Sequence, residues 1–501
     1  SKEFPDSLAF DSAFESGNLL SAHRIGALEY ELLLHPDHAT TGHTQWYLFS
    51  VGNAAGGCTY HFHITNLNKP DSLYGAGQQP LFFSSHAFSR EGKGWQRVGK
   101  DVKYVKNGRR RNGRPLFTLS FAVEFPHDGD KCVFAHCFPY TFTDLTKYLK
   151  SKQLSGASQF VFNCDVLCQT LAGNACHLLT ITANGTPEEL AARKGIFLSA
   201  RVHPGESNSS LIMKGILDFL TGTSAEAASL RSACVFKIIP MLNPDGVVNG
   251  HYRCNLAGYD LNRHWHWPSR KKHPTIYCAK EMLREFCKER EVEMFVDIHG
   301  HSVKHNMFMY GCPAKPKKDN DLLPPPSPKA FVQLLQTKSP HFSWRDSKFS
   351  TEKSKEHTGR VVVYREFDVQ NSYTLEASLC GAGDGKTSKH QFSAHDFEAM
   401  GTDFCLTLAE YCSTLMQQNF RRHGKGSVLD RHASLRQLLA ELAIDPALVP
   451  ALAPTDTETA SAQRDADDAA PGTVLAQPPS DHALQEAASA EQGGAEAGKR
   501  R

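Results

Sequence analysis

Two side chains that suit a metal ion, His203 and Glu206, follow directly on the apolar run 195–202. Pro204 and Gly205 separate them and cannot continue a helix, so the imidazole and the carboxylate can point at one cation. Zinc accepts such N and O donors at about 2.0–2.2 Å, and a catalytic zinc needs a third protein ligand and an open position. Because an isolated HxxE spacing is usually a chance match on a surface or loop, this pair needs support from elsewhere in the chain.

A histidine at the end of a second apolar segment offers that support. Residues 294–298 have the composition of a short buried strand, which His299 and Gly300 follow. The long interval after Glu206 has room for two crossover helices and a strand, so both strand ends can meet at one edge of a sheet. We therefore predict His299 as the third ligand. Asp297 and His301 are weaker candidates, for which we expect structural or supporting roles.

A carboxylate in an apolar setting marks a third segment. Glu376 stands within 372–379, among apolar and hydroxyl-bearing residues that predict a strand. Glutamate is rarely fully buried without a partner. Glu376 is therefore either ion-paired for structure or held in a site for proton transfer, and both interpretations stay open.

Cationic and amide side chains lie between the predicted ligands. Asn243-Pro-Asp-Gly246 predicts a turn, and Arg253, Asn262 and Arg263 follow it. Arginine presents a planar fork that suits a carboxylate or an oxyanion, so these residues beside a metal favour an anionic substrate group. The structural alternative is that the turn is ordinary and that arginine–aspartate pairs tie loops together.

Taken in order, these motifs resemble a known family. HPGE (203–206), NPDG (243–246), YR (252–253), DLNR (260–263), DIH (297–299) and TLEAS (374–378) are similar to the zinc metallocarboxypeptidases. Within them, the chain most resembles the cytosolic carboxypeptidases, which trim glutamates from protein tails. Segments 6–18 and 138–144 resemble parts of that family's amino-terminal domain, and DLNRHW with HPT at 273–275 is most similar to the short type-six subgroup.

The resemblance implies a catalytic centre with one zinc ion per chain. His203, Glu206 and His299 correspond to the zinc ligands, and Glu376 to the general base that activates the attacking water. Asp260 corresponds to an acid bonded to the first zinc histidine, in keeping with the rule that such histidines donate their other N–H to a carboxylate or carbonyl.

The resemblance also implies how the substrate is bound. Arg253 corresponds to the arginine that polarises the scissile carbonyl, and Asn262 with Arg263 to the pair that binds the terminal α-carboxylate. Arg360 precedes 361–364, which we expect to be a strand, and is our candidate partner for a substrate glutamate side chain; a surface-loop arginine is the alternative. Segment 347–356, where related digestive enzymes carry a mobile tyrosine, contains none, so we predict no catalytic tyrosine.

The function implied by the resemblance is removal of carboxy-terminal glutamates from polyglutamylated tubulin or other acidic tails. The alternatives are a metallocarboxypeptidase for terminal aspartate, basic or aliphatic residues, or a non-catalytic protein that binds tubulin tails. We expect a cytoplasmic protein, associated with microtubules, centrioles or cilia, without nucleic-acid or membrane partners.

Composition agrees with a multi-domain enzyme. The chain has 501 residues, enough for two or three domains, and its net charge of +2 favours neither acidic nor basic partners. The 14 cysteines form no CxxC pairs, so we expect reduced thiols rather than disulfides. The start has no signal-peptide pattern, and no run approaches 18 apolar residues, so we expect neither secretion nor membrane spanning.

Three regions are predicted along the chain. Short alternating segments in 1–148 predict an antiparallel β sandwich. Alternating strands and helices in 149–424 predict a mixed-sheet α/β carboxypeptidase domain, with helices near 211–220 and 397–416. Residues 425–501 are of low complexity, and we expect most of them to be disordered.

For three further motifs we favour a structural role over a functional one. His61 and His63 have a spacing that suits a metal but is more typical of a half-exposed strand. Residues 380–387 resemble a phosphate-binding loop, except that Cys380 stands where glycine is required, so we expect a loop that closes the sheet. The basic turn 106–114 could steer an acidic tail or act as a nuclear address, but a solvated hairpin is the simplest interpretation.

Overall fold

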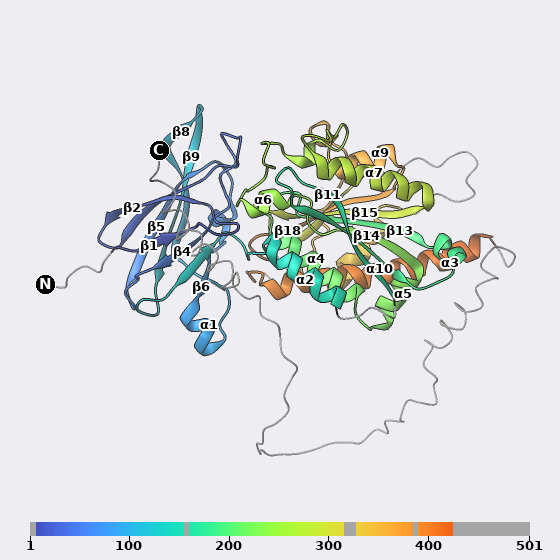
Figure 1. Ribbon diagram of the computed structural model, residues 1–501, viewed down its shortest axis with the longest axis horizontal. Coiled ribbons are helices and arrows are strands. Elements are labelled where there is room, and N and C mark those ends of the chain that lie inside the picture. Colours follow the sequence, from blue (N-terminus) through green and yellow to red (C-terminus); the bar gives the residue numbers. More distant parts are fainter. Residues whose placement is uncertain (1–6, 155–159, 315–326, 384–388, 424–501) are drawn as a thin grey trace, which may run out of the picture. The chain divides into compact units, whose positions relative to one another are not determined.

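The computed structural model describes residues 7–154, 160–314, 327–383 and 389–423, which form a β domain followed by an α/β domain (Figure 1). Among the described residues, both domains belong to one compact unit that ends at Ala409. Most of the segment 313–329, part of 380–387 and the tail 425–501 lie outside the described residues, and the domain boundaries at 148 and 424 stay predictions. No helix in the described ranges has the length and apolar character that a bilayer crossing requires.

The β domain packs two five-stranded sheets around a shared aromatic core. The first is antiparallel, with the order β1 (Ala9–Asp11), β4 (Leu48–Gly52), β10 (Cys132–Ala135), β6 (Leu81–Ser84) and β7 (Gln96–Arg97). The second has the order β2 (Leu19–Gly26), β3 (Glu29–Leu34), β5 (Thr59–Leu67), β9 (Arg114–Glu124) and β8 (Lys100–Arg111). Its β3 and β5 pair in parallel and its other neighbours antiparallel. The predicted antiparallel β sandwich is confirmed, with this one parallel pair as an exception.

Alternation of residue types explains how these strands form. On β3, Tyr30, Leu32 and Leu34 are buried, and the residues between them are partly exposed. Such a period of two turns one face of a strand towards a core. Phe62 of β5 and Phe134 of β10 meet across the sheets with ring centroids 5.3 Å apart, so the two sheets share one core.

The α/β domain contains an eight-stranded mixed sheet. Its order is β11 (Phe160–Gln169), β12 (Ala175–Ala183), β14 (Cys234–Ile239), β13 (Lys194–Ala200), β15 (Val292–His301), β18 (Asn371–Ser378), β16 (Met307–Gly311) and β17 (Lys348–Phe349). The four central strands, β14, β13, β15 and β18, pair in parallel, and antiparallel strands flank them. The predicted mixed α/β sheet is confirmed.

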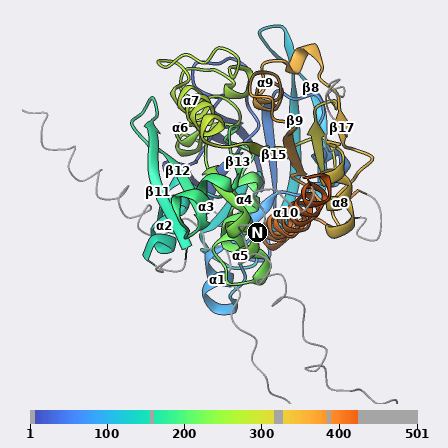
Figure 2. The same ribbon diagram turned by 90° about the vertical axis from the view of Figure 1, so that its right-hand side faces the viewer.

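Helices cover both faces of this sheet. Figures 1 and 2 show α7 and α9 on one face and α4 and α5 on the other. The main helices are α2 (Phe142–Leu154), α4 (Asn208–Leu220), α5 (Ala225–Ala233), α7 (Pro274–Glu289), α8 (Ala330–Lys338), α9 (Gly359–Glu366) and α10 (Ala394–His423). Parallel strands buried between two helical layers explain the nearly continuous apolar runs in the sequence.

One predicted element is wrong. Residues 361–364 belong to helix α9, not to a strand. The β-branched run Val361, Val362 and Val363 favours a strand in isolation, but all three side chains are buried in the domain's interior. Gly359 at the helix start lies against the Trp265 ring, where an added Cβ would come within 2.9 Å, so tertiary packing decides the local structure.

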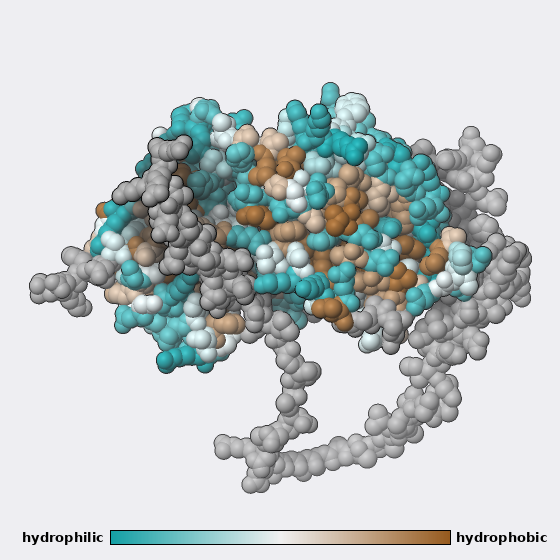
Figure 3. Space-filling view, viewed as in Figure 1, coloured by the Kyte–Doolittle hydropathy of each residue, from teal (hydrophilic) through white to brown (hydrophobic). Residues whose placement is uncertain are grey.

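The sheet's outer edge is less well covered. In Figure 3, hydrophobic residues lie among hydrophilic ones over the part of the face where Figure 1 draws β11. Val166 on this edge strand and Leu171 in the turn after it are exposed. The opposite situation holds at the sheet's centre, where the carboxyl ends of β13, β15 and β18 meet.

Candidate active site

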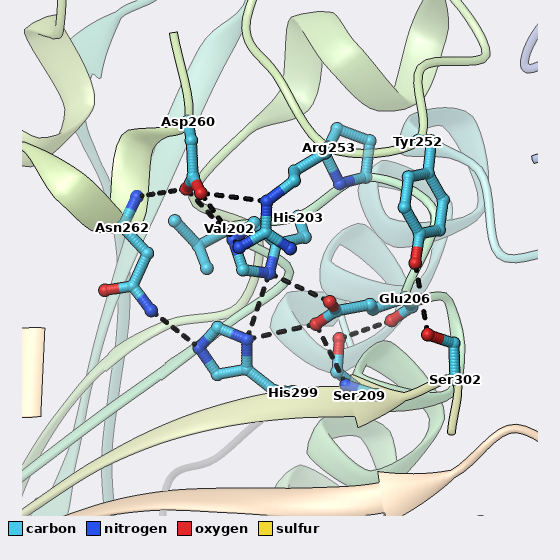
Figure 4. Close-up of polar contacts among 12 residues, drawn as sticks. Val202, His203, Glu206, Ser209, Tyr252, Arg253, Asp260, Asn262, His299 and Ser302 are labelled. Atoms are coloured by element: carbon cyan, nitrogen blue, oxygen red, sulfur yellow. Dashed lines mark hydrogen bonds and ion pairs between the residues drawn. The ribbon is translucent and has the colours of Figure 1, made fainter. Parts of the chain in front are cut away.

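The three predicted metal ligands converge at this central edge. The Nδ1 atom of His203 lies 2.9 Å from one carboxylate oxygen of Glu206, and Nδ1 of His299 lies 3.0 Å from the other (Figure 4). The two Nδ1 atoms are 3.2 Å apart. All three residues are buried, and their donor atoms lie close enough together to hold one metal ion, so the predicted ligand set is confirmed.

Backbone geometry brings His203 and Glu206 into position. Arg201 adopts a positive φ of 58° where the chain leaves β13, and its buried guanidinium donates to the carbonyl of Pro204 at 2.7 Å. Gly205 must be glycine, because a Cβ there would lie 2.6 Å from the Tyr252 ring. The Arg201 hydrogen bond and the Tyr252 ring thus hold the turn 203–206 in place.

The far nitrogen of each histidine is held by a carboxylate. His203 Nε2 lies 3.1 Å from Asp260 Oδ1, and His299 Nε2 lies 2.8 Å from Asp297 Oδ2. A carboxylate only accepts, so each Nε2 donates its proton to it, and each Nδ1 is the atom that would coordinate a metal ion. Three electron-rich donors are therefore gathered within bonding distance of one point.

This arrangement fits zinc. Tetrahedral zinc with ligands at 2.0–2.1 Å places neighbouring donor atoms roughly 3.3–3.4 Å apart, close to the separations observed here. Without a cation, burial lowers the pKa of His299, but Asp297 and Glu206 raise it well above its ordinary value. The two carboxylates therefore favour positive charge at this point, as a cation-binding site requires.

Arg253 is fixed beside the ligands by carboxylates from both domains. Its Nε and Nη2 atoms donate to Asp260 Oδ2, each at 2.8 Å. Asp37 of the β domain accepts three backbone N–H groups, from Tyr252 at 2.6 Å and from Arg253 and Cys254 at 2.7 Å each. Burial lowers the pKa of Arg253, but Asp260 and Glu206 raise it above the usual value, so the guanidinium stays charged.

Glu376 completes the centre from the neighbouring strand. It is the register partner of His299 in the parallel pair of β15 and β18. Burial raises the pKa of its carboxyl to about 8, against the lowering effect of His299. Glu376 lines a pocket of about 380 Å³ together with the three ligands and Arg253. A carboxyl group whose pKa lies near neutral pH is suited to proton transfer in such a pocket.

The predicted substrate-binding residues differ in burial and in how many of their side-chain donors already have partners. Asn262 is buried, and its amide contacts His299 Nε2 at 3.2 Å and accepts from Gly359 N at 3.0 Å. Arg263 is partly exposed on the pocket wall. Arg360 lines the pocket from α9, and its side-chain hydrogen bonds to the described residues all use Nη1, including one to the Gly311 carbonyl. Nη2 of Arg360 therefore stays available to a ligand.

Three lysines of the pocket wall were missed by the sequence analysis. They are Lys69, Lys348 and Lys355. Each comes from a loop, a short helix or an edge strand without a motif, so only the folded chain brings them to the site. No ion pair is formed by any of the three within the described parts of the chain.

Other candidates lie outside the centre or support it. Asp297 holds His299, as expected for a supporting role, and His301 lines the pocket without joining the ligands. His63 bonds to Glu29 at 2.8 Å and to Ser120, which makes it a structural residue of the β domain. Tyr252 and Tyr310 line the pocket, and the absence of a catalytic tyrosine stays a prediction.

Comparisons with known proteins agree with this architecture. The zinc carboxypeptidase family matches residues 150–407, and the amino-terminal domain of the cytosolic carboxypeptidases matches residues 10–110. The first match covers the mixed sheet and all the residues described above for the catalytic centre except Asp37 and Lys69.

Curated relatives carry names from the same family. Cytosolic carboxypeptidase 2 of Xenopus tropicalis is 45% identical over 407 residues, which are 81% of this chain and 42% of that protein. Cytosolic carboxypeptidase 3 of Bos taurus is 41% identical over 435 residues, which are 87% of this chain and 43% of that protein. The chain spans less than half the length of these relatives.

Solved structures share the fold at low sequence identity. A metallo-carboxypeptidase from Burkholderia cenocepacia superposes with a TM-score of 0.64 at 20% identity, covering 82% of this chain and all of that one. A metallo-carboxypeptidase from Pseudomonas aeruginosa, in complex with (2-guanidinoethylmercapto)succinic acid, gives 0.61 at 21% identity, covering 80% and 98%. These matches extend over both domains.

Proposed function

The chain belongs to the zinc carboxypeptidase family, and from that premise we propose that it hydrolyses the last peptide or isopeptide bond of acidic protein tails and releases glutamate. Polyglutamylated tubulin is the substrate that the family resemblance favours. The relatives' family name favours a cytosolic setting, and association with microtubules, centrioles or cilia belongs to the same proposal.

The charge of the pocket wall carries the proposal. Six cationic side chains line the pocket: Lys69, Arg253, Arg263, Lys348, Lys355 and Arg360. The acidic lining consists of Glu206, Glu352 and Glu376, of which the first faces the metal site and the last has its pKa raised towards 8. The surplus of positive charge favours a substrate with more than one carboxylate.

Each catalytic side chain has a role in the proposed reaction. When bound, zinc supplies a Lewis acid that polarises the carbonyl and acidifies water. Glu376 accepts the proton of the attacking water as its oxygen bonds to the carbonyl carbon. Arg253 donates to the oxyanion that forms. Glu376 then transfers the proton to the departing amine nitrogen as the C–N bond breaks.

The position of cleavage follows from the cations next to this centre. Arg263 binds the terminal α-carboxylate, which places the last amide bond over Glu376. Asn262 accepts from the Gly359 N–H at the start of α9, in addition to its proposed part in binding that carboxylate. Arg360 pairs with the side-chain carboxylate of the departing glutamate. Assignment to the type-six subgroup belongs to the proposal too, since the relatives compared carry the names of types two and three.

Release of glutamate from synthetic peptides tests the proposal. The zinc-loaded protein should release glutamate from peptides that end in several glutamates, as followed by mass spectrometry, and should act less well on matched peptides ending in aspartate, lysine or leucine. Arg360→Ala should lower kcat/KM for the glutamate peptide about tenfold or more, whereas Arg365→Ala, an exposed arginine of the same helix, should not.

Two outcomes would contradict the proposal. Faster release of leucine or lysine than of glutamate would indicate a carboxypeptidase of different specificity. Binding of the glutamate peptide without release by zinc-loaded protein would favour the non-catalytic alternative, and co-sedimentation of chelated protein with microtubules would then measure that binding.

A further inference from the structure

Lys69 reaches the pocket from the β domain. Its backbone carbonyl accepts from the Tyr104 hydroxyl at 2.5 Å. Its ammonium group donates to the Ser302 hydroxyl and, at 3.2 Å, to the hydroxyl of Tyr252. A backbone hydrogen bond of 3.2 Å from Leu73 to the Ser302 carbonyl secures the same segment against the α/β domain. Lys69 is thus held in place at the wall of the catalytic pocket.

The charge of Lys69 is not neutralised by an acid. Both side-chain partners are neutral hydroxyl groups, and no carboxylate among the described residues forms an ion pair with it. The side chain is only partly exposed. A cation held in a partly desolvated place by neutral groups attracts an anion more strongly than a freely solvated lysine does.

Lys69 lies on the side of the centre away from the proposed carboxylate-binding residues. Figure 4 shows Tyr252 and Ser302, its two partners, on one side of the His203, Glu206 and His299 cluster and Asn262 on the other. If the last residue of the substrate occupies the side of Asn262 and Arg263, a preceding chain that crosses the centre extended leaves towards Tyr252 and Ser302. An extended chain advances about 3.3–3.6 Å per residue, so the first residues before the cleaved bond come within reach of Lys69.

We infer that Lys69 is a specificity residue, which binds the carboxylate of a glutamate preceding the cleaved bond and so makes the β domain part of the substrate-binding site. This inference rests on the proposed function. It extends that function from the residue that is released to the one that is left behind. It also gives the β domain a direct part in choosing tails with consecutive acidic residues.

Paired peptides test this inference. Three peptides of one sequence, ending in Glu-Glu, Gln-Glu and Lys-Glu, differ only before the cleaved bond. Lys69→Met should lower kcat/KM about tenfold for Glu-Glu, mainly through KM, and less than twofold for Gln-Glu. Lys69→Glu should reverse the order and favour Lys-Glu over Glu-Glu. Lys103→Met removes an exposed lysine of the same domain and should leave the preference for Glu-Glu unchanged.

A purely structural role predicts a different pattern. If Lys69 only ties the domains together, Lys69→Met will slow all three peptides equally, and this result would overturn the inference. Ser302→Ala removes one of the two hydroxyl partners of the ammonium group but keeps the group itself, so the preference for Glu-Glu should persist in that variant.

Binding provides a readout that does not depend on turnover. In the Glu376→Gln background, calorimetry should show Glu-Glu binding more tightly than Gln-Glu, and Lys69→Met should abolish that difference. Failure of the wild type to release glutamate from any peptide would count against the proposed function. Equal affinities for the two peptides in this background would count against Lys69 alone.

Discussion

The ligand cluster and the cationic wall of the same pocket differ in how their charges are held. His203, Glu206 and His299 are buried at the ends of central strands, and each histidine has a carboxylate behind it. Lys348 and Lys355 on the wall are exposed, belong to an edge strand and a short helix, and form no ion pairs in the described structure. The sheet therefore fixes the chemistry, and peripheral segments can alter the selectivity without disturbing it.

The largest effect is expected within the buried cluster. Glu376→Gln should lower kcat by about 10³-fold, because the amide cannot accept the proton of water. Zinc content, measured by inductively coupled plasma mass spectrometry, should stay at the wild-type level, since Glu376 is not among the ligands. Loss of zinc together with activity would show that the base and the ligands do not act separately.

Asp297→Asn should have a smaller effect, because Asp297 is not a ligand but the hydrogen-bond partner of the ligand His299. The neutral amide accepts from the Nε2–H of His299 more weakly than the carboxylate does, so zinc affinity should fall about 10- to 100-fold, as measured by competition with a chelating dye. Asp165→Asn, at an exposed position on β11, is the control. An unchanged affinity in Asp297→Asn would mean that strand geometry alone orients the ligand.

On the cationic wall, a single change should affect binding rather than chemistry. Lys355→Met should raise KM for glutamate peptides up to about tenfold and leave kcat within a factor of two. Lys353→Met, in the same short helix but outside the pocket lining, should change neither. A fall in kcat for Lys355→Met would show that the cationic wall affects the chemical step as well as binding, against this prediction.

The smallest effect concerns stability and pH in metal-free protein. Burial raises the pKa of Glu376 to about 8, from about 4.3 in an unfolded chain. The folded state then binds more protons than the unfolded state, so this group lowers the free energy of unfolding as pH rises from about 4.3 to 8. In urea denaturation, the stability of Glu376→Gln relative to the wild type should increase from pH 5 to pH 8.

A zinc-loaded sample provides the control for this measurement. The charge of the ion lowers the carboxyl pKa, so the difference between wild type and variant should shrink when zinc is bound. If the free energy of unfolding of the variant and of the wild type depends on pH in the same way, with and without zinc, then folding does not raise the pKa of Glu376.

The two regions also differ in how far the sequence predicts them. His203, Glu206 and His299 follow apolar runs whose lengths and turn residues mark strand ends, and strand ends at one edge must converge. Lys69 and Asp37 belong to another domain, and only tertiary contacts bring them to the site. The helix at 359–366 was missed for a related reason, because three consecutive valines favour a strand unless the packing around Gly359 and Trp265 is known.

Asp37 has a consequence for the order in which the enzyme is assembled. Synthesis proceeds from the amino terminus, and domains fold largely as units, so we expect the β domain to present this carboxylate before residues 252–254 fold. The three N–H groups that it accepts would otherwise be left without partners in a buried position, at a cost of about 1–3 kcal/mol each. We therefore expect segment 252–254 to take its final position only after the β domain has folded.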